Sequence, residues 1–337
     1  MRRYFLLLLA LCTVRVIAQD LHFTQFNLSP LTLNPALTGN FYGTFRIGGI
    51  ARTQWSTFTT GYFTGSVYVD APIIQGFRKQ DWVGVGVHLF QDKSGSLGLE
   101  YNAAGLGATY HLGLDKEANN VLSIGFQGAS AKKQLDPLKV NDLVLPDQLF
   151  GGGTGGMDLG KLSQKGKGYQ DYTAGIMYQG VINDITDMKV GFAVFHLNTP
   201  RQGSIFNNGG ERIPMRLTGH ATVNTSIMEK ILLSPSLVFH KVGPATEIAL
   251  QALGGWVFNE EKNIIFHFGP GYRFGDALQI LTGLDYGSIR AGVGFDMNIS
   301  QLSPASGSFG ALEVGVGYIA RIYKKPKADN LLICPRF

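Results

Sequence analysis

Apolar residues alternate with polar or small residues along most of this chain. In residues 289–297, the apolar series Ile, Ala, Val, Phe and Met is interleaved with Arg, Gly, Gly and Asp, and residues 82–90 and 312–320 follow the same rule. Successive side chains of a β-strand point to opposite faces, so a period of two predicts strands with one apolar face. Fourteen such runs are found, at residues 44–54, 60–70, 81–90, 97–112, 120–132, 170–179, 187–198, 213–225, 230–240, 246–258, 263–273, 276–285, 287–297 and 309–321.

Each run has the length of a tilted strand that crosses a bilayer, which is roughly ten residues. A soluble β-sandwich or propeller also alternates, but no repeat of the kind that propeller blades need is visible. We therefore predict an all-β fold, a transmembrane antiparallel β-barrel of about 14 strands over residues 44–321, in an outer membrane.

The connections give an independent check on this prediction. The longest ones, at residues 133–169, 199–212 and 298–308, follow the fifth, seventh and thirteenth runs, whereas residues 71–80 form a longish turn at the opposite end. In an even-stranded barrel with periplasmic termini, connections after odd-numbered strands are extracellular and tend to be long. Apolar residues in these loops are candidates for partner binding, although they could equally pack the loops onto one another. They are Leu143, Val144, Leu149, Phe150, Ile205 and Phe206.

The first 18 residues have the features of a signal peptide. Arg2 and Arg3 precede an apolar core at residues 4–12, and a small-residue cleavage site lies before Gln19. After cleavage Cys334 is the one cysteine, so no internal disulfide is possible. The 29 basic residues include three in this leader, which leaves a near balance with the 24 acidic residues and gives no support for nucleic-acid binding. Residues 322–337 form a C-terminal tail.

Motifs for catalysis or metal binding are weak. Gly155, Gly160 and Lys161 have the spacing of a phosphate-binding loop, but Leu162 stands where Ser or Thr would bind Mg²⁺. Histidines fall about one per predicted strand without metal-ligand spacing, and no GxSxG motif occurs. We expect no enzyme activity, no catalytic or metal site and no cofactor, with the histidines and the acidic Asp296 and Glu313 as polar residues of the lumen.

Glycine repeats on the second face of several strands, in the pairs Gly84/Gly86, Gly292/Gly294 and Gly315/Gly317. A wide channel needs polar residues there, whereas small inner residues make room for something bulky. Residues 19–43 are a candidate filler, because residues 27–41 are apolar, uncharged and stiffened by two prolines. We predict a non-helical wedge that enters the lumen at the periplasmic end; the alternative is a simple periplasmic lead-in. The candidate plug residues are Leu28, Pro30, Leu31, Leu33, Asn34, Pro35 and Leu37.

Residues 19–55 resemble the start of the PorP/SprF family of type IX secretion system membrane proteins. The matching features are Gln19-Asp20, Phe23-x-Gln25-Phe26, Asn34-Pro35-Ala36 with Gly39, and Arg52-x-Gln54-Trp55. The C-terminal Cys334-Pro335-Arg336-Phe337 agrees with the family in style.

This resemblance implies an outer-membrane barrel that takes part in gliding motility or in the secretion or anchoring of a large surface adhesin. The implied partners are the cargo's C-terminal sorting domain, a periplasmic OmpA-like peptidoglycan-binding protein and outer-membrane lipids, and no catalytic residues are implied. An alternative resemblance is a fatty-acid-transporter-like barrel that takes up a hydrophobic small molecule. That family shares an early Asn-Pro-Ala element but has a longer N-terminal plug.

Overall fold

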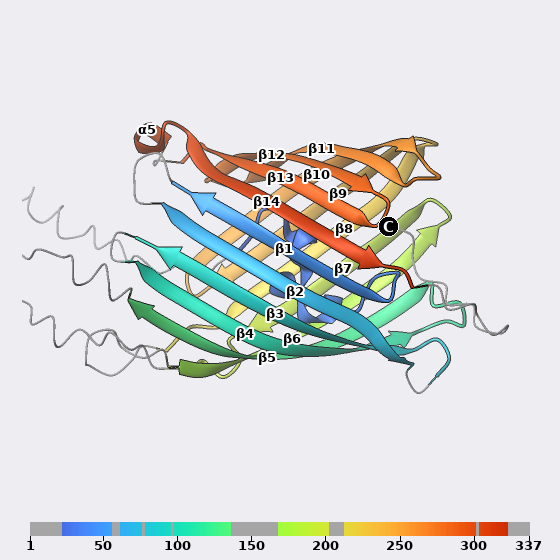
Figure 1. Cartoon of the computed structure of the whole chain (residues 1–337), viewed down its shortest axis with the longest axis horizontal. Helices are drawn as coiled ribbons and strands as arrows, with labels where there is room; N and C mark the ends of the chain where they lie inside the picture. The colour runs from blue at the N-terminus through green and yellow to red at the C-terminus, as the bar shows by residue number, and fades with distance from the viewer. Residues whose placement is uncertain are drawn as a thin grey trace, which may run out of the picture.

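A computed structural model describes residues 22–55, 61–75, 78–95, 98–135, 168–201, 212–300 and 303–322 of the 337-residue chain. Within these residues, fourteen antiparallel strands form one closed barrel, in which each strand pairs with its chain neighbours and the last strand pairs with the first (Figure 1). The strands are β1 (Phe45–Gln54), β2 (Tyr62–Gln75), β3 (Trp82–Ser94), β4 (Leu99–Gly113), β5 (Asn120–Leu135), β6 (Gly168–Asn183), β7 (Thr186–Phe195), β8 (Arg216–Met228), β9 (Ile231–Val242), β10 (Ala245–Asn259), β11 (Ile264–Arg273), β12 (Ala277–Tyr286), β13 (Ile289–Asn298) and β14 (Phe309–Ala320). The predicted fold class is confirmed.

Each of the fourteen predicted runs corresponds to one strand, but the turn expected at residues 71–80 is wrong in part. The strand β2 continues to Gln75, and its pairing with β3 shifts register between Pro72 and Ile74. A strand tolerates proline at such an irregularity, because the missing N–H then removes no regular ladder bond. Proline therefore marked a local break in pairing here and not the end of the strand.

The strands have two distinct faces. Outward side chains are mostly apolar and well exposed, with Leu106 at 68% and Phe258 at 72%, as expected for a surface that faces lipid. Inward side chains include glycines and many buried polar residues. Closure of the barrel pairs every strand on both edges, which is what a sheet needs inside hydrocarbon. No helix in the described part of the chain is long and apolar enough to cross a bilayer.

The two ends of the barrel differ in their connections. Odd-numbered strands end on the left of Figure 1, where the short helix α5 (Ser303–Ser306) lies. The longest separations in sequence between consecutive strands, from Leu135 to Gly168 and from Phe195 to Arg216, follow odd-numbered strands. Even-numbered strands end in shorter turns on the right. Barrels of outer membranes place short turns in the periplasm and longer loops outside, so we call the left end extracellular and the right end periplasmic.

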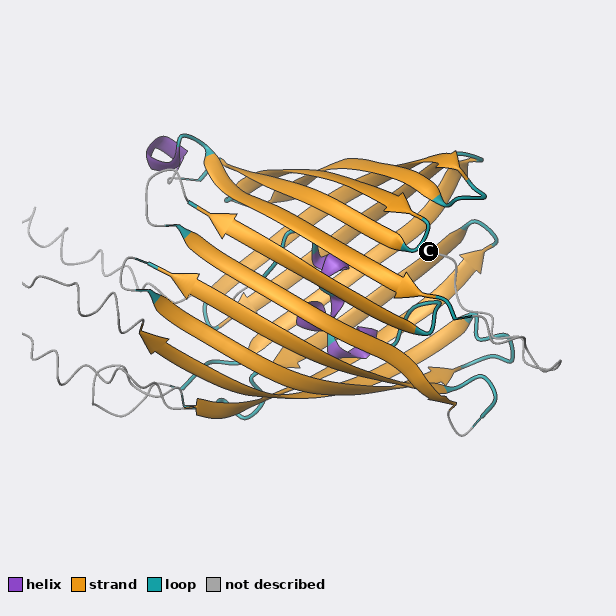
Figure 2. Ribbon diagram, viewed as in Figure 1, coloured by secondary structure: helices purple, strands orange, loops and turns teal. Residues whose placement is uncertain are grey.

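Residues 22–41, which we call the internal segment, lie inside the barrel and contain the other helices of the described residues (Figure 2). These are the 3₁₀ helix η1 (Phe26–Leu28), the single turn α2 (Pro30–Leu33) and the 3₁₀ helix η2 (Pro35–Leu37). The expectation of a non-helical segment is therefore wrong. Each proline is the first residue of its helix, a position where the missing N–H would have had no intrahelical partner.

Candidate functional site

The internal segment is buried along most of its length. Its apolar side chains form two clusters on different walls of the lumen. Leu28 packs with Phe23 and with Ile50 of β1, whereas Leu33 packs with Phe26 and Val238 of β9. Of the seven predicted plug residues, Leu37 is half-buried and the others are buried: Leu28, Pro30, Leu31, Leu33, Asn34 and Pro35.

Glycines of the inner wall lie directly against this segment. A Cβ on Gly125 would come within 2.5 Å of the Ala36 nitrogen and the Pro35 carbonyl carbon, both of which are backbone atoms. A Cβ on Gly86 would lie 2.9 Å from the Thr38 methyl group. Contacts below about 3 Å are not found in real packing, so these positions have no room for a side chain. Close contacts with the segment recur at Gly84, Gly175, Gly292 and Gly315.

Two backbone N–H groups at the start of the segment bind one carboxylate of the wall. Thr24 and Gln25 donate to the two oxygens of Glu313 at 2.7 and 2.8 Å. Arg52 of β1 donates to Glu313 at 2.5 Å and to Asp296 of β13 at 3.0 Å. Bonds to ionised groups are stronger than neutral ones, so this arrangement holds the segment at a defined height in the lumen.

The Thr24 hydroxyl is shared by three charged side chains. It lies 3.0 Å from the carboxylate oxygens of Asp296, and it accepts from Arg52 at 3.0 Å and from Arg273 at 2.8 Å. One O–H donor and two lone pairs are the full capacity of a hydroxyl. Two buried guanidinium groups face two buried carboxylates, so the group is close to neutral and each charge has a partner, as burial requires.

Asn34 occupies the centre of the segment and is fully buried. Its side-chain oxygen accepts from the N–H of Ala36 at 2.9 Å. Its amide nitrogen donates to the carbonyl of Ile176 in β6 at 3.2 Å and lies 3.1 Å from Nε2 of His220 in β8. Asn34 is extended, at φ −160° and ψ 124°, because a following proline disfavours the helical region.

The end of η2 is held by an imidazole and an indole. His111 Nε2 donates to the carbonyl of Thr38 at 2.8 Å, and its Nδ1 lies 2.7 Å from the hydroxyl of Ser123. The Trp82 ring stacks on His111 at 4.6 Å between centroids, and its Nε1 donates to the carbonyl of Gly39 at 3.1 Å. Because a carbonyl can only accept, the bond to Thr38 sets the histidine tautomer.

The segment leaves the lumen through a turn at Gly39, whose φ of +72° favours glycine. The N–H of Gly39 donates to Asp70 at 2.7 Å, and Asp70 is paired with Arg46 at 2.7 Å. Lys189 of β7 donates to the side-chain oxygen of Asn40 at 3.1 Å. These contacts orient the chain as it enters β1.

The sequence predicts a wedge at the periplasmic end of the lumen, but the segment is not confined to that end. Thr24 bonds to Asp296, which lies near the extracellular end of β13, whereas Asn40 bonds to Lys189, near the periplasmic start of β7. The segment therefore runs from the extracellular half of the lumen to the periplasmic half. Local sequence gives no signal for this, because the bonds join residues more than 100 positions apart.

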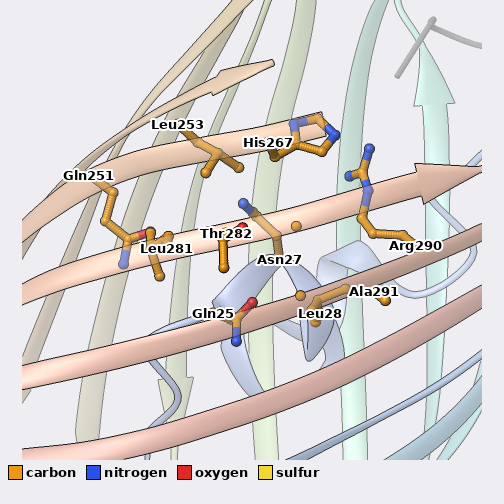
Figure 3. Close-up of a pocket in the computed structure, with 12 residues that line it drawn as sticks. Gln25, Asn27, Leu28, Gln251, Leu253, His267, Leu281, Thr282, Arg290 and Ala291 are labelled. Carbon is orange, nitrogen blue, oxygen red and sulfur yellow. The ribbon is translucent and has the colours of Figure 1, made fainter. Parts of the chain in front are cut away.

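A small cavity remains between the segment and the wall formed by β10 to β13 (Figure 3). It has a volume of about 60 Å³ and is lined by Gln25 and Leu28 of the segment and by Leu253, His267 and Arg290 of the wall. A bulk water occupies about 30 Å³, so this space suits one or two waters. No group of three or more side chains in the described residues could hold a metal ion.

Outside the strands, the turn between β2 and β3 is held by the buried carboxylate of Asp81. Burial by itself would raise the pKa of Asp81, but bonds from Arg78, from the Tyr110 hydroxyl and from the N–H of Gly113 outweigh it and lower that pKa below its usual value. Asp81 directly precedes Trp82, so this turn sets the position of the indole that contacts the internal segment.

Sequence reasoning missed several residues of this site and left others untested. It noted Asp296 and Glu313 as lumen acids but did not connect them to Thr24, and it gave no role to Arg52, Arg273 or Trp82. A charged residue on the inner face of a glycine-rich strand was the available signal. The six loop candidates, Leu143, Val144, Leu149, Phe150, Ile205 and Phe206, lie outside the described residues, as do the predicted signal peptide and nearly all of the C-terminal tail.

Solved structures with the same fold include outer-membrane channels. The toluene transporter TodX of Pseudomonas putida is similar with a TM-score of 0.51 and 11% identity, over 89% of this chain and 94% of that one. A TodX deltaS2S3 mutant, described as a monoaromatic hydrocarbon channel, gives a TM-score of 0.50 and 10% identity, over 87% and 94%. At this identity the likeness shows the fold alone. No protein with a curated description matches the chain in sequence.

The sequence also matches a family model over residues 16–318, which is most of the chain. The family is described as "Type IX secretion system membrane protein PorP/SprF", and this description indicates no enzymatic family. The match includes the internal segment and all but the last two residues of β14. The chain therefore belongs to the PorP/SprF family of type IX secretion system membrane proteins, as an outer-membrane β-barrel.

Proposed function

We propose that this barrel binds the C-terminal sorting domain of a large surface adhesin at its extracellular rim and helps to secrete or anchor it. Family membership supports a place in type IX secretion. A periplasmic OmpA-like peptidoglycan-binding protein is the proposed partner at the short-turn end, on the resemblance alone. Such a partner would tie the adhesin mechanically to the cell wall.

The observation that carries this proposal is the internal segment itself. Its polar groups bond to strands around the lumen, among them β1, β2, β3, β4, β6, β7, β8, β10, β13 and β14. A folded cargo domain could not pass a lumen closed in this way. The extracellular rim, where the long connections after β5, β7 and β13 begin, is then the accessible surface. Loops on a rigid scaffold are where recognition usually lies.

Cargo retention at the cell surface tests the role of the rim. Residues 136–167, 202–211 and 299–308 would be shortened one at a time, with the connection at residues 56–60 shortened as the matched control on the same end. We expect at least one of the three to lower retention severalfold while the control leaves it unchanged. Unchanged retention in all three variants would contradict contact at the rim.

Planar-bilayer recordings test the closed lumen separately. The intact barrel should show no stable, large conductance, and deletion of residues 19–40 should open one. A large, porin-like conductance in the intact protein would exclude closure by the internal segment. This result would also remove the observation that carries rim binding, whereas the retention experiment tests rim binding directly.

Uptake of a small hydrophobic molecule is the second candidate, supported by the fold shared with TodX. The cavity beside the internal segment speaks against it, because its volume is about 60 Å³, whereas an apolar cavity that binds benzene has about 150 Å³. Accumulation of labelled toluene or a long-chain fatty acid in cells with and without the protein distinguishes the two functions.

A further inference from the structure

The outer surface of the barrel has a hollow of about 750 Å³ on the side where β14, β1, β2, β3, β4 and β5 lie. Its floor is made of small outward residues, namely Gly49, Ala51 and Gly65. Larger apolar side chains stand around this floor and are about half exposed or somewhat less: Phe63, Val67, Leu89, Val314 and Val316. The hollow therefore faces the hydrocarbon of the membrane.

Packing within the barrel does not require these small residues. A Cβ on Gly49 would come no closer than 3.3 Å to another atom, and one on Gly65 no closer than 3.4 Å. This contrasts with the inner-wall Gly125, where a Cβ would collide with the backbone of the internal segment. The inner glycines make room for part of this chain, whereas no described residue of this chain occupies the space above the outer ones.

The hollow is apolar at one end and polar at the other. Gln91, Asn102 and Ser130 line its extracellular end, and Gln91 donates to Asn102 at 2.9 Å. The next outward position of β3 is Lys93, which pairs with Glu100 at 2.8 Å. The hollow thus crosses the level at which the outward face changes from apolar to polar, which is the hydrocarbon boundary of a membrane barrel.

Charge at that boundary is positive on balance. Lys93 is half exposed although it is paired with Glu100, and Lys132 is exposed on the outer face of β5. Two cations against one carboxylate favour an anionic group at this level. A long apolar hollow that ends beside cationic side chains matches an amphiphile with an anionic head and a hydrocarbon tail.

The geometry points to a specific binding site for one outer-leaflet lipid, with an acyl chain over Gly49, Ala51 and Gly65 and a phosphorylated headgroup near Lys93 and Lys132. A flexible acyl chain can fill a floor of small residues, and the change from apolar to polar lining matches the tail and head of one molecule. A second copy of the barrel would bring a rigid, apolar wall and would leave the polar end without a counterpart. We therefore favour a lipid over a protein partner.

Native mass spectrometry of the full chain in mild detergent tests this site. Wild type should retain one lipid, and Ala51→Leu, which fills the floor of the hollow, should lower its occupancy at least tenfold. Ala252→Leu is the matched control, because Ala252 is an exposed outward residue of β10 on another part of the wall. Lys132→Glu should release phosphorylated lipids while leaving uncharged ones bound.

A second measurement uses only the wild-type protein, so it does not depend on how a variant folds. A photoactivatable phospholipid in vesicles should crosslink to β1–β3 at least fivefold more than to β10–β12. Equal retention by wild type and Ala51→Leu, or even crosslinking around the barrel, would overturn the proposal. A dimer that Ala51→Leu abolishes would also overturn it and would assign the hollow to a second copy.

Discussion

The two ends of the internal segment are held by different physics. Residues 22–25, the ionic end, are bound by charged side chains of the wall, chiefly Glu313, Arg52 and Asp296. Residues 34–39, the glycine-lined turn, lie so close to the wall that a Cβ on Gly125 would overlap with them. Charged bonds contribute most at the ionic end, whereas close packing against wall glycines contributes most at the glycine-lined turn, where Asp70 adds one charged bond.

This difference predicts how a substitution in the wall destabilises or displaces each region. Removing a charge at the ionic end leaves another buried charge unpaired, which is costly although the shape of the lumen is unchanged. Adding a methyl group beside the glycine-lined turn leaves every charge paired but forces the backbone to move. Only the second change must displace the segment, so the two regions can be separated by measuring stability and displacement together.

Glu313→Ala should have the largest effect on stability. It removes the acceptor for two backbone N–H groups and for Arg52, and breaking a buried pair in this way costs about 3–5 kcal/mol. Denaturant unfolding in detergent measures this loss. Glu261→Ala is the control, because Glu261 is exposed in the turn between β10 and β11 and should matter less. Equal unfolding midpoints for Glu313→Ala and wild type would show that charge does not hold this end.

Gly125→Val should have the second-largest effect on stability, and it should act by displacing the internal segment from the wall. Overpacking costs up to about 3 kcal/mol, and the segment should become accessible to protease and the lumen more conductive. Gly128→Val is the matched control on the same strand, since its Cβ would meet only the outward Tyr172 ring, at 3.4 Å. If both variants resist protease equally, the close approach of segment and wall is not what holds this turn.

Asn34→Ala should cost about 1–2 kcal/mol, because His220 and the N–H of Ala36 lose their partner inside the barrel. The smaller side chain leaves the turn in place, so protease resistance and closure of the lumen should persist. Thermal unfolding followed by circular dichroism measures the stability. An open lumen in this variant would show that the amide itself, and not the shape around it, keeps the turn seated.

The smallest effect concerns Asp81, outside both regions. Its pKa is lowered in the folded protein, so its contribution to stability is present above the usual carboxyl pKa and is lost as the pH falls below about 4. Asp81→Asn should therefore flatten the stability profile in that range, with little change in the closure of the lumen. An unchanged acid limb of the profile would argue against this role for the carboxylate.

The barrel could be predicted because its signal is local. Alternation such as that of residues 289–297 follows from the pleat of a single strand, and strand length follows from the bilayer, so count and topology could be read without any tertiary contact. The inner glycines also predict a close neighbour inside the lumen, and the proline-rich segment is the candidate for that neighbour. The helical turns have no such local signal, because a proline excludes a helix interior but can also begin a helix, as Pro30 and Pro35 do here.

What the sequence determined by itself was therefore the wall: its fourteen strands, its two faces and its family. The tertiary structure alone decided how the internal segment is bound inside that wall. The bond between Thr24 and Glu313 spans 289 positions, and no periodicity records such a pairing, because it depends on how the closed wall brings β1, β13 and β14 around one threonine. The same holds for the outer hollow, which exists only where the side chains of neighbouring strands leave Gly49 and Gly65 uncovered.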